Sequence, residues 1–173
     1  MTAGPGGGIL LLCYGNPARL DDGLGPAFGA AIEQIAPPGV TVETDYQLTV
    51  EDSHAAAGYR TVVFVDAAVA GDAAFFFRPV CPGAMQSFSS HSLDPEHVLA
   101  LAGELFGRKP EGYALGIRGY EFNDFGEQLS PAARANLEAA LQFLLPVLGH
   151  GDFARASAAT TACPGGRASK DGD

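Results

Sequence analysis

The chain has 173 residues, of which 47% are hydrophobic and 17% are charged. This length suits one domain with a sizeable core, and this composition excludes a chain that is disordered throughout. Lys and Arg total 10 against 20 Asp and Glu, which gives a formal net charge of -10. Because such an acidic surface repels phosphates and anionic lipids, we expect neither nucleic acid nor a membrane as a partner.

The three cysteines, Cys13, Cys81 and Cys163, are odd in number and irregularly spaced. They predict neither a disulfide framework nor a zinc site of the CxxC kind, so we expect a reducing, cytoplasmic setting. The start of the chain has no basic segment, and the apolar run over 9–14 is far shorter than the roughly 20 residues of a membrane helix. We therefore expect no signal peptide and no membrane span.

Hydrophobic patterning predicts a chain in which strands alternate with helices. Gly- and Pro-rich residues predict a flexible start over 1–8, and the loss of periodicity predicts a disordered tail over 150–173. A single domain is predicted over 9–149. Its predicted strands cover 9–14, 40–50, 61–66, 73–80 and 112–117. Its predicted helices cover 24–35, 51–58, 95–106 and 131–148, and Asp21 or Asp22 is a good N-cap for the first of them.

This alternation predicts an α/β sandwich of three layers. In such sheets, ligands bind beyond the carboxyl ends of the strands, where the strand order changes direction. The loop after the first strand carries Asn16, Asp21 and Asp22, and the third strand ends on Asp66. Because the first and third strands are commonly neighbours in this architecture, we expect these carboxylates to converge on one crevice.

The candidate site combines Asp22, Asp66 and His91. Two carboxylates and an imidazole form a mixed oxygen and nitrogen ligand set that suits a divalent transition metal, and the same groups could serve acid–base chemistry. Each residue also has a structural interpretation. Asp22 could cap the following helix, Asp66 could cap a turn, and His91 could be a solvated histidine of a Ser-rich loop.

Other chemistries receive little support from the sequence. Gly15, Gly23 and Gly25 could mimic a phosphate-binding loop, but their spacing does not match GxGxxG and no Walker lysine follows. Neither HExxH nor GxSxG occurs, which disfavours the zincin and serine-hydrolase interpretations.

Four segments, in chain order, are similar to the hydrogenase maturation endopeptidases. Together they cover about residues 9–149. The segments are LLCYGNPARLDDGLGPAFGAAI, TVVFVDAA, FSSHSLDPEHVLALAGELFG and GIRGYEFNDFGEQLSPAARANLEAAL. The first three resemble that family's signatures, and the fourth resembles its closing strand, acidic loop and final helix. This resemblance implies a three-layer α/β/α sandwich with a five-stranded, mostly parallel mixed sheet in which one strand is antiparallel.

The resemblance also implies an activity. The family removes a short carboxy-terminal peptide from the large-subunit precursor of nickel–iron hydrogenases after the metal centre has been inserted. Carried over one residue at a time, the family's metal-binding and catalytic positions fall on Asp22, Asp66 and His91. Nickel would then be held by the precursor as a recognition element, with no organic cofactor. The family is grouped with aspartic-type endopeptidases, and water could be activated by a carboxylate or by the metal.

One position departs from the family pattern, because many relatives have Glu where this chain has Asp22. Asp21, the residue before it, could share the ligand role; by itself it is interpreted as a capping or loop-ordering residue. Two alternative functions remain. One is a metal-dependent chaperone that recognises the precursor without cutting it. The other is an α/β domain that binds a nucleotide or a flavin.

Overall fold

The structure, a computed structural model, describes residues 7–83 and 93–158. These residues contain a five-stranded sheet with the strand order β2-β1-β3-β5-β4. Strands β1, β2, β3 and β5 run parallel, whereas β4 pairs antiparallel with β5. The strands are β1 (Ile9–Tyr14), β2 (Val40–Asp45), β3 (Thr61–Ala68), β4 (Phe75–Val80) and β5 (Glu111–Arg118). The predicted mixed sheet is confirmed, as is the adjacency of the first and third strands.

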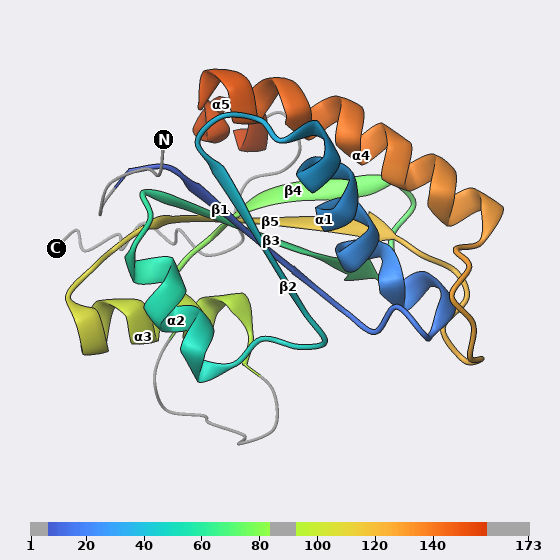
Figure 1. Ribbon diagram of the computed structural model, residues 1–173, viewed down its shortest axis with the longest axis horizontal. Helices are drawn as coiled ribbons and strands as arrows, with labels where there is room; N and C mark the ends of the chain where they lie inside the picture. Colours follow the sequence, from blue (N-terminus) through green and yellow to red (C-terminus); the bar gives the residue numbers. More distant parts are fainter. Residues whose placement is uncertain (1–6, 84–92, 159–173) are drawn as a thin grey trace, which may run out of the picture.

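Helices cover both faces of this sheet, which confirms the three-layer sandwich (Figure 1). Helices α1, α4 and α5 lie on one face, and α2 and α3 lie on the other. The helices are α1 (Leu24–Ile35), α2 (Val50–Ala57), α3 (Pro95–Phe106), α4 (Pro131–His150) and α5 (Phe153–Ala158), and a short 3-10 helix, η1 (Leu20–Gly23), precedes α1. No helix in the described part of the chain combines the length and apolarity needed to cross a membrane.

Two hydrophobic cores lie between these layers. Alternate residues of β1 point into opposite cores. Leu11 faces α1 and α4, whereas Leu10 and Leu12 face α2 and α3. The same division holds in β3, where Val63 and Phe64 belong to opposite cores. Burial on both faces explains why these central strands are continuous apolar runs instead of alternating ones.

Two local predictions are wrong. Neither Asp21 nor Asp22 caps α1, because both lie in η1 and the N-cap is Gly23. The second strand ends at Asp45 and not near Val50, because Thr49 and Asp52 form a capping box that begins α2.

The predicted disordered tail is also wrong over its first part. Helix α4 extends to His150 and α5 follows it. Phe153 of α5 is 2% exposed, and its ring stacks on Tyr113 at 5.4 Å between centroids. The rest of the predicted tail, 159–173, and residues 1–6 of the predicted flexible start lie outside the described residues.

Candidate functional site at the carboxyl edge of the sheet

Asp22 and Asp66 lie at the carboxyl edge of the sheet, where β1 and β3 end side by side. The amino end of α1 packs tightly against these two strands. A Cβ on Gly25 would overlap the Tyr14 carbonyl oxygen and come within 2.8 Å of the Val65 carbonyl oxygen. Only glycine permits this approach, which holds the loop carrying Asp22 close to the end of β3.

Asp22 is half-buried and is held by the loop that follows β1. Its Oδ2 accepts a hydrogen bond from the Asn16 backbone N–H at 2.9 Å, and the Asn16 Oδ1 accepts one from the Ala18 N–H at 2.9 Å. Gly15 has φ of 141°, and a Cβ there would overlap the Asp22 carbonyl oxygen. The loop therefore folds back on itself and fixes the direction of the carboxylate.

Asp66 is half-buried in β3, directly after five buried residues. Burial, together with the negative charge of Asp22, raises the pKa of the Asp66 carboxyl to about 6, against the lowering effect of a hydrogen bond from the Ala67 N–H to its Oδ1 at 2.7 Å. The structure thus brings Asp22 and Asp66 close enough for their charges to interact. A cation between them would relieve this repulsion, so the two carboxylates suit a divalent metal.

Asp21 has a different environment from its neighbour and is fully buried. Its carboxylate accepts hydrogen bonds from the backbone N–H groups of Tyr120, Glu121 and Ser130 at 2.8, 3.0 and 2.7 Å, and from the Ser130 hydroxyl at 2.7 Å. Burial opposes ionisation, but these donors lower the pKa of Asp21 below its usual value. The interpretation of Asp21 as a loop-ordering residue fits these contacts, whereas a capping role for α1 does not.

The loop after β5 is fastened to the loop after β1 at further points. The Leu20 N–H donates to the Gly126 carbonyl at 2.8 Å, and the Gly126 N–H donates to the Ala18 carbonyl at 2.8 Å. Arg118, at the end of β5, donates to the Val69 and Gly71 carbonyls at 2.9 Å. Three loops at the carboxyl edge are therefore held in one arrangement around the paired carboxylates.

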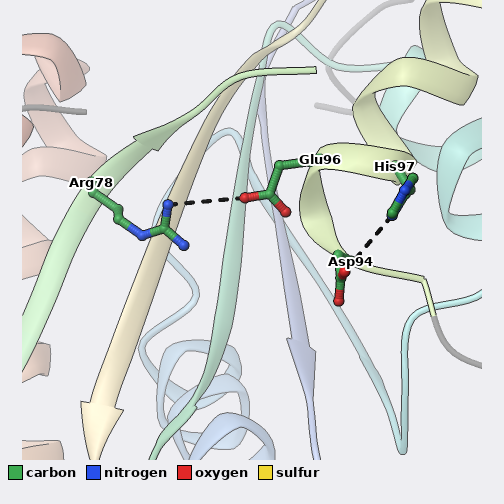
Figure 2. A network of polar contacts seen from close by, with 4 residues as sticks. All are labelled: Arg78, Asp94, Glu96 and His97. Carbon is green, nitrogen blue, oxygen red and sulfur yellow. Dashed lines mark ion pairs between the residues drawn. The ribbon is translucent and has the colours of Figure 1, made fainter. Parts of the chain in front are cut away.

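The sequence argument missed a set of polar residues on the sheet face that α3 covers. Arg78 of β4 lies 3.9 Å from Glu96 of α3, and Asp94 lies 3.8 Å from His97 (Figure 2). Tyr14 is half-buried, and its pKa is raised by burial and by Asp66, Asp94 and Glu96, with Arg78 opposing. The position of Tyr14 was predictable, because it ends β1 on the same face as Asp66. The positions of Arg78 and Glu96 depend on how β4 and α3 dock.

The third predicted site residue, His91, lies outside the described residues. Within 7–83 and 93–158, no group of three His, Cys, Asp or Glu side chains is arranged to hold a metal ion. The described part of the predicted site is therefore the pair Asp22 and Asp66.

The three glycines of the loop after β1 serve packing. A Cβ at Gly23 would meet the Pro17 Cα at 3.0 Å. At Gly15 and Gly25, backbone oxygens of the chain already occupy the space that a Cβ would need. Backbone atoms of the chain itself therefore occupy the position that a Cβ would take at each of these glycines. This packing role explains the glycines without a phosphate ligand, so they no longer point to a nucleotide or flavin site.

The fold and the site define a class: three-layer α/β/α proteins with paired carboxylates at the carboxyl edge of a mixed sheet. Solved structures of hydrogenase maturation proteases have this fold. The hydrogenase maturating endopeptidase HybD from E. coli matches with a TM-score of 0.67 and 22% identity, over 84% of this chain and 94% of that one. The [NiFe] hydrogenase maturation protease HycI from Thermococcus kodakarensis matches with a TM-score of 0.63 and 21% identity, over 82% and 92%.

A hydrogenase 2 maturation peptidase from a Thaumarchaeota archaeon matches with a TM-score of 0.60 and 19% identity, over 82% of this chain and 98% of that one. At these identities the likeness establishes the fold, and the predicted resemblance is confirmed at that level. A scan against models of known protein families finds no match. A search of curated protein sequences also finds none.

Proposed function

We propose that this protein is an endopeptidase that removes a carboxy-terminal peptide from the nickel-loaded large-subunit precursor of a nickel–iron hydrogenase. The observation that carries the proposal is the convergence of Asp22 and Asp66 at the carboxyl edge of a fold that the solved maturation proteases share. The four sequence segments that resemble the family, in the same order along the chain, support it independently.

In this proposal, nickel belongs to the precursor and acts as the recognition element. Asp22 and Asp66 would contribute oxygen ligands, and His91 would contribute a nitrogen ligand from the segment that precedes α3. Such a mixed set suits a borderline divalent ion better than an all-oxygen set does. Binding the precursor's metal at this edge would bring the neighbouring scissile bond to the same carboxylates, where a water molecule could be deprotonated or the peptide carbonyl polarised.

The test is intact-mass analysis of candidate precursors after incubation with the protein, with and without nickel. We expect loss of the carboxy-terminal peptide only from the nickel-loaded form. Asp66→Ala and His91→Ala should fold and leave the precursor uncut. Asp72→Ala, which removes an exposed carboxylate after β3, is the matched control and should cut normally.

Three outcomes would contradict parts of this proposal. Normal cutting by both Asp66→Ala and His91→Ala would refute the site. A stable complex that forms without any loss of mass would favour the chaperone alternative. Thermal stabilisation by ATP, NAD or FMN would favour the nucleotide or flavin alternative. Asp22→Glu keeps a carboxylate and restores the family's usual residue, so we expect it to retain activity if that carboxylate binds the metal.

A further inference from the structure

A small pocket opens beside the loop that positions Asp22. Its volume is about 150 Å³, and it lies between the loop after β1, the first turn of α1 and the end of β2. It is lined by Gly15, Pro17, Pro26, Thr44, Asp45 and Tyr46. Gly15 adjoins Asn16, whose N–H binds the Asp22 carboxylate, so the pocket wall and that carboxylate belong to the same short loop.

The lining of this pocket is suited to an apolar group. Its lining residues include two prolines and Tyr46, a residue that is 67% exposed. Two oxygens of Asp45 already accept hydrogen bonds, its Oδ1 from the Tyr46 N–H at 2.6 Å and its carbonyl oxygen from the Gly15 N–H at 3.1 Å. An apolar occupant would therefore cover the Tyr46 ring without breaking these hydrogen bonds.

The size of the pocket selects its occupant. Pockets for drug-sized molecules occupy about 300–1,000 Å³, whereas this one has about 150 Å³. The pocket therefore suits a single side chain of a larger ligand, such as one branched aliphatic group, instead of a whole small molecule. The backbone around it is held in place by the Gly15–Asp45 hydrogen bond and by two prolines, so little order has to be gained on binding.

We propose that this pocket is a specificity subsite that binds one branched aliphatic side chain of the polypeptide substrate, beside the bond held at Asp22 and Asp66. This inference rests on the proposed endopeptidase function, because only a polypeptide would present one side chain here and a scissile bond at the carboxylates. Tyr46 is then the specificity-determining residue, because it is the large exposed side chain among the residues that line the pocket.

The test uses a series of nickel-loaded precursors in which each residue flanking the scissile bond is changed in turn to Gly, Ala, Val or Leu. For the wild-type protein we expect kcat/KM at one position to rise by roughly fourfold per added methylene, the value of burying that group. Tyr46→Ala should reduce this preference to within about twofold. Val69→Ala is the matched control, because Val69 is 70% exposed at the same sheet edge and does not line the pocket.

A binding measurement separates the pocket from the peptidase activity. N-acetyl-leucinamide should shift the backbone amide signals of Gly15, Thr44 and Tyr46 in the wild-type protein, whereas N-acetyl-glycinamide should not. If no precursor is cut and leucinamide still shifts these signals, the proposed function fails and the apolar pocket stands. If precursors are cut with no side-chain preference, or if leucinamide leaves these signals unchanged, the subsite is refuted, whether or not Tyr46→Ala folds.

Discussion

Replacing Asp66 with asparagine tests the paired carboxylates through stability instead of activity. The amide keeps an oxygen that can accept the Ala67 N–H and removes the negative charge. Burial and the charge of Asp22 raise the pKa of Asp66 from an ordinary 3.8 to about 6. At 1.36 kcal/mol per pKa unit, this difference corresponds to a penalty of about 3 kcal/mol for ionised Asp66 in the folded protein. Asp66→Asn should therefore increase the free energy of unfolding at pH 8 by at most about 3 kcal/mol.

The sign of the pH dependence follows from the raised pKa. The folded protein binds this proton more tightly than the unfolded chain, so the contribution to stability is fully present below 3.8 and is lost as the pH rises through about 6. The gain from Asp66→Asn should accordingly be near zero at pH 4 and largest at pH 8.

Urea denaturation at several pH values, in EDTA to keep the protein metal-free, measures this difference. Asp72→Asn is the control, because it removes an exposed carboxylate from the loop after β3 and should show no such pH dependence. A stability gain of the same size at pH 4 and pH 8 would refute the argument, as would a variant less stable than the wild type at pH 8.

Three further predictions concern neighbouring positions. Asp22→Asn should lower the pKa of Asp66, because it removes the nearby negative charge. Carbon NMR titration of the Asp66 carboxyl measures this pKa, and an unchanged value would show that the two groups do not interact. Asp21→Ala should cost about 3 kcal/mol or more in urea denaturation, because it leaves several donors of the loop after β5 without their acceptor. Gly25→Ala should reduce the thermal midpoint sharply, because the added Cβ would overlap carbonyl oxygens of the strands. Gly149→Ala is the contrasting case: its Cβ would enter open space within α4, so the free energy of unfolding should rise by roughly 0.5–1 kcal/mol.

Most of the fold was predictable because its elements are bounded by local signals. Strand β1 is a continuous apolar run ended by Gly15, and α3 begins at Pro95 and ends before Gly107. Where prediction failed, the decisive contacts were distant in sequence. In the sequence, Asp21 has the features of a helix cap. In the structure its carboxylate instead binds Ser130, which lies 109 residues further along the chain. Phe153 likewise sits in a segment without periodicity and is ordered by packing on the sheet.

The candidate site also has one part that was predictable from the sequence and another that was not. The convergence of Asp22 and Asp66 was predictable, because parallel neighbouring strands present their carboxyl ends at one edge. The position of Arg78 opposite Glu96 was not predictable. Its position requires β4 to run antiparallel beside β5 and α3 to bring Glu96 within reach. Both are properties of the assembled sheet that no local pattern in the sequence expresses.

Asp21 and Asp22 are adjacent in the chain, and their surroundings give them separate roles. The donors around Asp21 favour its ionised form and join the loop after β1 to the loop after β5. Asp22 is thereby presented to Asp66, where two negative charges raise the free energy of the folded protein unless a cation binds. Stability and cutting activity should therefore fall together in Asp21→Asn, whereas in Asp66→Asn stability should rise as activity is lost. A fall in both quantities for Asp66→Asn would mean that Asp66 serves the fold, and the metal-binding role proposed for it would have to be abandoned.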